Sequence, residues 1–345
     1  MDKLRVGTFA IIVPYKLFRI FLEKGKKDEL CKITDKNSMQ YELAVMKKIY
    51  DIPNCLDYYT NINIDSVKNI PSDSRFIRHL LNMGNDEITR FIYRNANLCY
   101  FFMKNEGAED LHDIMNIIEE DGIHPFLINP EEKFKEFVTQ IIEALYYLHE
   151  NKIAHLDIKP ENIIYNSNSK SFKKSWKLID FGLSDYYPFN RYLKKGPYGT
   201  LHYIPCEINK DSDIYINYIP IKYLPLISCN DWIYTTKGYI HYEKYYNGKN
   251  INYTNIYKTD VYALGITIKC IYQCLLNCSQ IPQWSTNTNK MNSFHTNTEE
   301  LIRCMVYSDI NRRLTTKEVM KLAFFKENKT KTSSTICNKI MNFIC

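Results

Sequence analysis

The sequence has no run of about 18 apolar residues, the length that a membrane-spanning helix requires. The nearest approach is the stretch from Phe9 to Leu22, which Lys16 and Arg19 interrupt. That stretch also lacks the small-residue cleavage site that ends a secretory signal peptide. We therefore expect no membrane span and no signal peptide.

A strong charge of either sign is also missing. The 345 residues include 45 Lys and Arg against 39 Asp and Glu, which gives a net charge of +6 spread along the chain. So mild a balance favours acidic partners only weakly, and no repeat of basic and aromatic residues indicates a nucleic-acid platform. No internal repeat is present. With 45% hydrophobic and 24% charged residues the chain has the composition of a soluble globular protein.

The cysteines number 11, which is an odd count, and they are scattered through segments expected to be buried, such as that around Cys99. We interpret them as reduced thiols, which predicts a cytosolic location. Cys270, Cys274 and Cys278 recur every four residues. A metal cluster is one interpretation, but no fourth ligand follows at zinc spacing. A buried helix face is the favoured interpretation.

The chain is also rich in Tyr, with 28 residues, and in Asn, Ile and Lys. This bias is typical of an AT-rich coding genome, such as that of a virus or a protist. For a viral protein the predicted location becomes the cytoplasm of the host cell.

The first hundred residues have the pattern of strands and one helix. Segments rich in β-branched and aromatic residues predict strands over 5–13, 17–23, 29–34 and 98–104, with a turn at 25–28. Asn37 is expected to cap a helix whose apolar stripe is formed by Leu43, Met46 and Ile49.

The rest of the chain is mainly helical in pattern. Asn129 is the expected cap of a helix with Pro130 at its first position, and apolar residues then recur at helical spacing to Leu148. Further helices are predicted from Asp260, over 299–305 and over 316–324. Strands followed by helices predict an α+β fold with two unequal lobes. The segments 57–97 and 209–257 are longer than connections require, and we expect both to be insertions that form solvated surface excursions.

Two motifs carry the chemistry. In the run from Ile153 to Ile164, Asp157 follows His155 by two residues, Lys159 follows Asp157 by two, and Asn162 follows Asp157 by five. This spacing is typical of the protein-kinase catalytic loop. The triplet Asp180-Phe-Gly then has the form of the family's second magnesium-binding motif. From Glu29 to about Phe325 the chain resembles a eukaryotic-type serine/threonine protein kinase.

The resemblance implies a two-lobed kinase fold that uses ATP and Mg²⁺. Asp157 would be the catalytic base, and Lys159 would neutralise charge on the transferred phosphoryl group. Asn162 and Asp180 would hold the magnesium ions, because both offer hard oxygen ligands. Taken alone, Asp157 and Asn162 could instead form an Asx turn. A Lys at position 159 is the serine/threonine form of the motif.

Lys32 lies in an apolar, β-rich frame and resembles the phosphate-binding lysine of the family, with Glu42 as its partner on the following helix. The ten-residue separation is shorter than usual, so the connection between strand and helix must be tight. The alternative is a surface lysine and a surface helical glutamate. Met46 would stack beneath Glu42, toward Phe181 and His155.

The family's lobes would divide the chain into an N-lobe over 1–104, a C-lobe over 105–325 with the insertion at about 209–257, and a tail over 326–345. Met103 and Asn105 lie at the boundary between the lobes and are expected to contact the nucleotide.

The segment from Tyr198 to Glu207 resembles the end of an activation segment. Thr200 would bond to Asp157 and Lys159, and Glu207 would form a buried ion pair with Arg313. Asp260 would support the backbone of the catalytic loop from the start of its helix.

Three positions depart from the family pattern. The glycine-rich phosphate loop is reduced to Gly7 if it lies over 5–10, and has no glycine if it lies over 12–16. Leu156 replaces the arginine that normally receives an activation-loop phosphate. We therefore expect activity that does not depend on phosphorylation of the residues after Asp-Phe-Gly, namely Ser184, Tyr186, Tyr187 and Tyr192. Cys206 stands where the family usually has proline.

The sequence thus predicts a serine/threonine protein kinase that phosphorylates protein substrates. Two alternatives remain: a pseudokinase scaffold with impaired nucleotide binding, and a small-molecule phosphotransferase of kinase-like fold. Thr200, Glu207 and Arg313 argue against the second alternative, because these residues build a platform for protein substrates.

Overall fold

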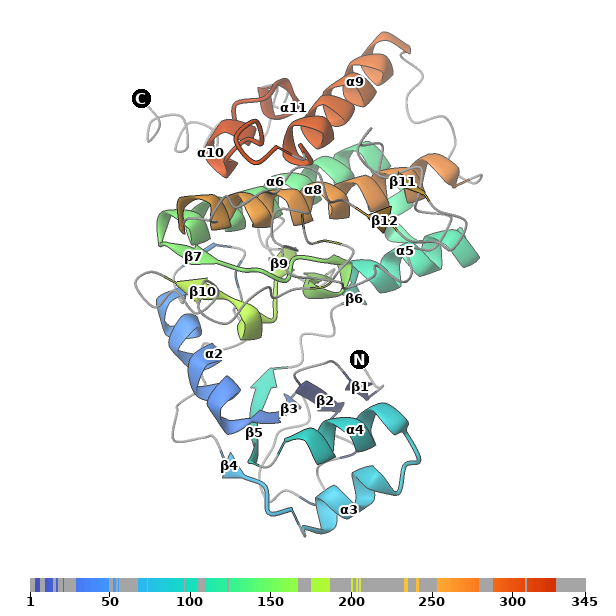
Figure 1. Ribbon diagram of the computed structural model, residues 1–345. Helices are drawn as coiled ribbons and strands as arrows, with labels where there is room; N and C mark the ends of the chain where they lie inside the picture. The colour runs from blue at the N-terminus through green and yellow to red at the C-terminus, as the bar shows by residue number, and fades with distance from the viewer. Residues whose placement is uncertain are drawn as a thin grey trace.

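A strand-rich part and a larger helical part make up the computed structural model (Figure 1). The described residues are 4–6, 10–14, 17, 21, 29–49, 52–53, 55, 68–72, 74–95, 97–104, 109–122, 124–166, 175–186, 200, 203, 205, 233–234, 240–241, 253–278, 288–307 and 309–326. This arrangement is the α+β class that the sequence predicts.

The strand-rich part is an antiparallel sheet in the order β1-β2-β3-β5-β4. Its strands are β1 (Arg5–Val6), β2 (Ala10–Pro14), β3 (Glu29–Asp35), β4 (Lys68–Asn69) and β5 (Leu98–Lys104). The register places Lys32 between Ile12 and Phe101. Because side chains alternate along a strand, Lys32 points to one face of the sheet and its neighbours Cys31 and Ile33 to the other.

The strand predicted over 17–23 is wrong where it can be compared. Leu17 has helical backbone and Phe21 lies in a turn. The Phe21 ring contacts the rings of Phe76 and His79, at centroid distances of 5.7 and 4.8 Å. The segment therefore packs on a helix and does not extend the sheet. The turn predicted at 25–28 lies outside the described residues.

Helix α2 (Lys36–Ile49) begins at the residue after β3 ends. The Asp35 carboxylate caps it, because Oδ1 accepts the amides of Asn37 at 2.9 Å and Ser38 at 3.4 Å. Asn37 is therefore not the cap that the sequence predicted. Since the cap is the last strand residue, no loop separates strand from helix, and this explains the ten-residue spacing of Lys32 and Glu42.

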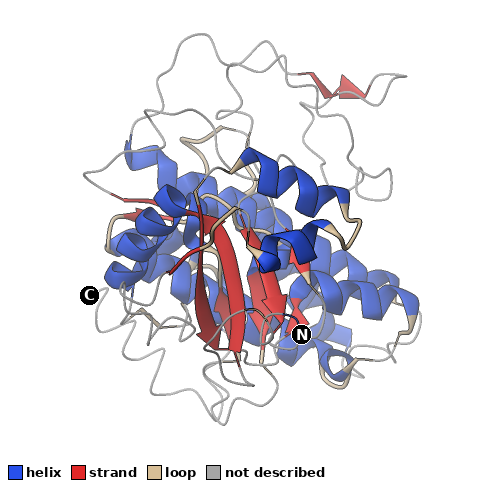
Figure 2. Cartoon of the chain, turned by 90° about the horizontal axis from the view of Figure 1, so that it is seen from below, coloured by secondary structure: helices blue, strands red, loops and turns tan. Residues whose placement is uncertain are grey.

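The segment 57–97 is more ordered than the predicted surface excursion, which is wrong over 68–94. It contains β4 and the helices α3 (Arg75–Leu81) and α4 (Asp86–Arg94). Ser74 and Asn85 cap them by accepting amide hydrogens of the first turn. Their buried side chains pack on the sheet face that carries Cys31 and Ile33, and Figure 2 shows helices lying across the strands. That face is apolar, so helices cover it.

The helical part contains α5 (Leu111–Glu120), α6 (Pro130–Glu150), α8 (Tyr253–Asn277), α9 (Thr288–Met305), α10 (Thr316–Val319) and α11 (Ala323–Lys326). The 3₁₀ turns are η3 (Pro125–Leu127), η4 (Pro160–Asn162) and η6 (Phe181–Leu183). Short strands join in the sheet β6-β8-β9 and in the pairs β7–β10 and β11–β12. They are β6 (Glu109–Asp110), β7 (Ile153–Ala154), β8 (Ile163–Tyr165), β9 (Trp176–Leu178), β10 (Asp185–Tyr186), β11 (Ile233–Tyr234) and β12 (Ile240–His241).

The predicted helices exist, but their bounds differ. Helix α8 starts seven residues before Asp260, and α9 starts well before residue 299. The helix predicted over 316–324 is two short helices. Helix α6 begins at Pro130 as predicted, yet the Asn129 side chain makes no capping bond. Of the insertion predicted at 209–257, the structure describes β11, β12 and the start of α8; the remainder lies outside the described residues.

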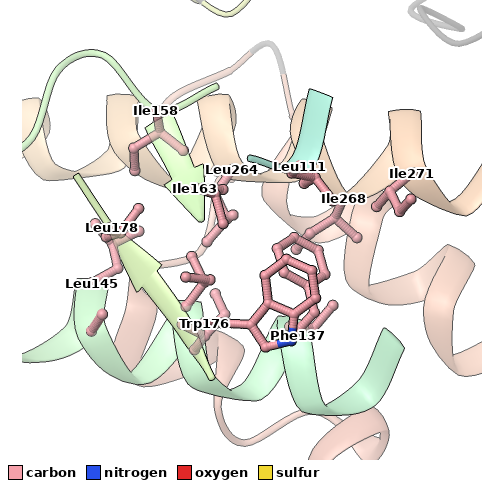
Figure 3. Packing of buried hydrophobic residues seen from close by; sticks show 14 of the residues in the cluster. Leu111, Phe137, Leu145, Ile158, Ile163, Trp176, Leu178, Leu264, Ile268 and Ile271 are labelled. Carbon is pink, nitrogen blue, oxygen red and sulfur yellow. The ribbon is translucent and has the colours of Figure 1, made fainter. Parts of the chain in front are cut away.

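The main core lies between α6 and α8, where side chains from both helices meet those of β8 and β9 (Figure 3). Trp176 of β9 is fully buried, and its ring lies 5.0 Å from that of Phe137 and 5.9 Å from that of Phe126. Its amide donates to the Gln140 Oε1 at 2.9 Å. These contacts fix the β8–β9 hairpin, which carries the site described below, on the helical part.

The cysteines of the described segments all carry free thiols. Cys274 is buried on α8 and donates to the carbonyl of Met115, and burial raises the pKa of the Cys270 thiol to about 12. Cys270 and Cys278 are half-buried and pack against the same core that contains Cys274, so these contacts support the interpretation as a buried helix face. Among the described helices, none combines the length and the apolar character that crossing a membrane demands.

Candidate active site

Asp157 lies on the loop between β7 and β8 and is buried. Its Oδ2 accepts the Asn162 Nδ2–H at 3.0 Å and pairs with the Lys159 Nζ at 3.0 Å. Its Oδ1 accepts the hydroxyl of Thr200 at 2.8 Å, and that hydroxyl also accepts from the Lys159 Nζ at 2.9 Å. The two bonds predicted for Thr200 are thus confirmed. The residues 157, 159, 162 and 200 form one polar cluster around a single carboxylate.

The backbone of this loop is held from α8. Asp260 is fully buried, and its carboxylate accepts the amides of His155 at 2.7 Å and Leu156 at 2.8 Å. It also accepts from the Nε2 of His149 at 3.0 Å. The supporting role predicted for Asp260 is therefore confirmed, and His149 is a partner that the sequence did not reveal.

Lys32 makes two charged contacts. Its Nζ lies 2.5 Å from the Glu42 Oε1 on α2 and 3.2 Å from the Asp180 Oδ1. The side chains of Lys32 and Glu42 are only 5% and 3% exposed, whereas that of Asp180 is 41% exposed. The alternative of a surface lysine and a surface glutamate is therefore wrong. The contacts bring Asp180, which is 148 residues from Lys32 in the sequence, to the Lys32–Glu42 pair.

The Asp180 carboxyl is subject to opposing effects. Partial burial raises its pKa, but the charge and the hydrogen bond of Lys32 lower it, and the net effect of the surrounding groups holds the pKa of Asp180 below its ordinary value. His155 and Lys159 act in the same direction as Lys32. The carboxylate is therefore ionised at neutral pH.

Asp180 adopts a left-handed backbone, with φ of 62°, and its side chain caps the turn that follows by accepting the amide of Gly182. Next in the chain, Phe181 is fully buried, and its ring centroid lies 4.8 Å from that of His155. His155 in turn bonds through Nε2 to the carbonyl of Ile179 at 3.0 Å. This ring contact joins the Asp-Phe-Gly turn to the catalytic loop.

Met46 packs with Met39, Leu43 and two residues of β5, Cys99 and Phe101. This small cluster fixes α2 on the sheet face to which Lys32 points. The stacking of Met46 toward Phe181 stays a prediction.

Asn162 and Asp180 offer oxygen atoms of the chemical kind that a magnesium ion binds. The Asn162 Nδ2 donates both to the Asp157 carbonyl at 2.8 Å and to its carboxylate, so the amide is turned with Oδ1 away from these groups. Lys32 and Gly182 both bind the Oδ1 of Asp180. The backbone holds the two residues together, because Ile179 N donates to the Asn162 carbonyl at 3.0 Å. Carboxylate and amide oxygens are the ligands that Mg²⁺ prefers.

The strands distinguish between the two positions predicted for the phosphate loop. Since β1 pairs with β2, the residues 7–9 connect them, and Gly7 is in that connection. The alternative loop over 12–16 is wrong, because Ile12 to Pro14 belong to β2. Gly7 itself lies outside the described residues.

The remaining predicted positions are described in part. Met103 lies on β5, opposite Leu30, while Asn105 and Glu207 lie outside the described residues, as do Cys206, Tyr187 and Tyr192. Arg313 is fully buried, and its guanidinium donates to the carbonyls of Tyr307 and Lys258. The predicted pair of Glu207 and Arg313 therefore stays a prediction.

Sequence reasoning missed two further contacts near the site. The Tyr41 hydroxyl on α2 donates to the Asp185 Oδ1 on β10 at 3.2 Å. The hydroxyl of Ser184 donates to the carbonyl of His155 at 3.2 Å, and Ser184 is fully buried. The two bonds span 144 and 29 residues of sequence, so no local pattern indicates them.

A lysine–glutamate pair, a catalytic-loop aspartate and an Asp-Phe-Gly turn, arranged on a small sheet and a helical part, define the class of two-lobed phosphotransferases. A family model described as "Protein kinase domain" matches residues 27–217, more than half of the chain. The chain belongs to the protein kinase family.

Relatives bear names of the same class. A putative serine/threonine-protein kinase of Acanthamoeba polyphaga mimivirus is 26% identical over 93% of this chain and 88% of its own. Calcium-dependent protein kinase 6 of Plasmodium berghei is 33% identical over 60% of this chain, and an Aurora kinase of Yarrowia lipolytica is 32% identical over 33%. The matched regions cover only 12% and 30% of these last two proteins.

Proposed function

We propose that this protein kinase is catalytically active and transfers the γ-phosphate of MgATP to serine and threonine hydroxyls of protein substrates. The observation that carries the proposal is the position of Lys32, whose Nζ contacts both Glu42 and Asp180. Catalysis in this family requires the lysine–glutamate pair and the metal-binding aspartate to be in place together. The contacts of Lys32 with Glu42 and with Asp180 support both conditions.

The proposed roles follow from the contacts. Lys32 would bind the phosphates, and Glu42 would hold Lys32 in position. Asp157 would orient the acceptor hydroxyl and accept its proton, while Lys159 would neutralise the charge that develops. Asn162 and Asp180 would hold the magnesium ions, which bridge the phosphates and offset their charge when bound.

The lobes and the nucleotide contacts are part of the proposal. The sheet and α2 would form the N-lobe over 1–104, and the C-lobe would extend over 105–325, with a tail over 326–345. Met103 and Asn105, at the boundary, would contact the nucleotide.

Serine/threonine preference is supported by the cluster of Lys159, Thr200 and Asp157. Thr200 bridges the catalytic carboxylate and the lysine. These contacts of Thr200 support the proposal that the end of the activation segment lies beside the catalytic loop and would position an acceptor residue there.

The second candidate is a scaffold that binds partners without turnover. The observation that favours it is the loop over 7–9, which has one glycine where close approach of backbone amides to phosphates requires several.

One experiment tests these functions. The purified chain is incubated with labelled ATP, Mg²⁺ and a generic basic protein, beside Asp157→Ala and the control Asp86→Ala. Asp86 is an exposed carboxylate on α4, which covers the sheet face opposite Lys32. We expect label on serine and threonine, a loss of at least about 100-fold in Asp157→Ala, and no loss in the control. Equal incorporation by the wild type and Asp157→Ala would reject the kinase function, and nucleotide binding without turnover would support the scaffold.

A further inference from the structure

Tyr41 and Asp185 connect two elements that bear on catalysis. Tyr41 precedes Glu42 on α2, and Asp185 is the fifth residue after Asp180, on β10. The Tyr41 hydroxyl donates to the Asp185 Oδ1 at 3.2 Å. Asp185 is only 1% exposed, and the Tyr41 side chain packs against the main core. The bond is therefore largely shielded from water.

The Asp185 end of this bond is tied to the catalytic loop. In the β7–β10 pair, Asp185 lies opposite Ala154, the residue before His155. The preceding residue, Ser184, donates its hydroxyl to the His155 carbonyl at 3.2 Å. The backbone at Asp185 thus cannot shift without disturbing the loop that carries Asp157.

The Tyr41 end is tied to Glu42. Adjacent helix residues move together, so a bond that fixes Tyr41 also restrains the Glu42 carboxylate, which lies 2.5 Å from the Lys32 Nζ. The contact therefore couples the orientation of α2 to the strand that follows the Asp-Phe-Gly turn.

In the family, an arginine directly before the catalytic aspartate binds an activation-loop phosphate. The catalytic loop of this chain has no cation at that position, so a phosphate would not couple it to α2. Leu156 precedes Asp157, and it is apolar and buried. Asp185 adds a carboxylate beside α2, which would repel a phosphate group brought close to it. In this chain a contact that involves no phosphate can couple α2 to the strand after the Asp-Phe-Gly turn.

We propose that the hydrogen bond from Tyr41 to Asp185 is a positioning contact that holds α2, and with it Glu42, against Lys32 without a phosphorylated activation segment. Tyr41 and Asp185 act through Glu42 and the catalytic loop and do not contact the substrate. The effect on turnover rests on the proposed kinase function. The effect on α2 does not.

The test uses the full chain and the variant Tyr41→Phe, which removes one hydroxyl and leaves the ring. Tyr93→Phe is the matched control, because Tyr93 is 77% exposed on α4. We expect Tyr41→Phe to lower kcat about 10-fold, the effect of losing one hydrogen bond to a charged group. The KM for the protein substrate should stay at the wild-type value, the melting temperature should fall by only about a few degrees so that the variant remains folded, and Tyr93→Phe should change nothing. A kcat equal to that of the wild type would overturn the proposal.

Asp185→Asn provides a second measurement, since it keeps an acceptor oxygen but removes the charge. In that background the effect of Tyr41→Phe on kcat should shrink, because the two residues act through one bond. If the two substitutions lowered kcat by independent and fully additive amounts, Tyr41 would act through a group other than Asp185. Treatment of the wild type with a broad-specificity phosphatase should leave kcat unchanged, and loss of activity would contradict independence from phosphorylation.

A readout that needs no activity separates this proposal from the kinase function. Hydrogen exchange of the α2 amides should be faster in Tyr41→Phe than in the wild type and in Tyr93→Phe. If the wild type transfers no phosphate but the exchange difference is present, the kinase function fails and the positioning contact stands. Unchanged exchange in α2 would reject the contact whatever the activity.

Discussion

The Asp260 Oδ1 accepts the amide hydrogen of Leu156 at 2.8 Å, and Leu156 is held in the left-handed region of backbone space, with φ of 66°. A leucine in this region is strained by about 1–3 kcal/mol and persists only where its surroundings fix it. The other oxygen of Asp260 accepts the preceding amide, that of His155. One buried carboxylate thus imposes the shape of the loop that presents Asp157.

Asp260→Asn should therefore destabilise the protein. An amide offers one acceptor oxygen in place of two, so at least one buried backbone N–H loses its partner, at a cost of about 1–3 kcal/mol. Urea denaturation of the variant and the wild type at neutral pH measures the difference. Asp86→Asn, the same change on the surface of α4, should have no effect. Equal stability of Asp260→Asn and wild type would show that the loop does not depend on the second oxygen.

Lys32→Met should cost stability in a pH-dependent way. Removing the lysine takes away the ammonium group that lies 2.5 Å from the buried Glu42 carboxylate, and breaking a buried ion pair in this manner costs about 3–5 kcal/mol. Lys32 also holds the pKa of Asp180 below its ordinary value, despite the opposite effect of burial. A lowered folded-state pKa contributes stability above the unfolded pKa of about 4, and this contribution is lost as the pH falls through the folded value.

The difference between wild type and Lys32→Met should accordingly be largest near pH 7 and shrink as the pH falls below about 4, toward the lowered folded-state pKa of Asp180. Chemical denaturation at several pH values measures it. A difference that grows on acidification would mean that Lys32 does not stabilise the ionised form of Asp180. Lys48→Met, which changes an exposed lysine of the same helix that carries Glu42, is the control.

The catalytic loop and the Asp-Phe-Gly turn could be predicted because their residues are close in sequence and their spacing is set by one local structure. Lys32 could be identified because an apolar strand surrounds it. The contact of Tyr41 with Asp185 could not be predicted, because it depends on how α2 packs against β10, and the two residues are 144 positions apart in the sequence.

The errors in the predicted fold have local causes. Asp35 and Asn37 are both good capping residues, and the sheet pairing of Asp35 with Leu98 decides between them. The helices α3 and α4 do have capping signals, at Ser74 and Asn85. The length of the segment 57–97 nevertheless favoured a solvated surface excursion. The sequence does not show that helices cover the sheet face that carries Cys31 and Ile33.

Helix α10 begins with a capping box, and the contribution of this box to the stability of the protein should depend on pH. The Thr315 amide and hydroxyl both donate to the Glu318 carboxylate at 2.8 Å, and these bonds lower the pKa of Glu318. Thr315→Ala should destabilise the protein by about 1 kcal/mol at neutral pH. Because the pKa is lowered in the folded state, the loss should diminish as the pH falls below the unfolded value of about 4.5. Thermal unfolding at pH 7 and at acidic pH measures it, with Lys317→Ala as control, and a pH-independent loss would contradict the role of Glu318.

Thr200 gives a test of the catalytic cluster itself. Its hydroxyl donates to the Asp157 Oδ1 at 2.8 Å and accepts from the Lys159 Nζ at 2.9 Å. Thr200→Val keeps the shape of the side chain and removes both bonds, each to a charged group. We expect kcat/KM to fall at least about 10-fold, since such a bond contributes about 1.5–3 kcal/mol.

Thr200→Ser retains the hydroxyl but lacks the methyl group, and it should keep most of the wild-type rate. Comparing the two variants therefore separates the effect of the hydroxyl's hydrogen bonds on the rate from the effect of the methyl group. Steady-state kinetics with a serine-containing protein substrate provides the measurement, and the melting temperature checks that both variants fold. If Thr200→Val and Thr200→Ser lost activity equally, the methyl contact and not the hydroxyl bridge would be responsible. Full activity in Thr200→Val would mean that Asp157 and Lys159 reach their catalytic positions without it.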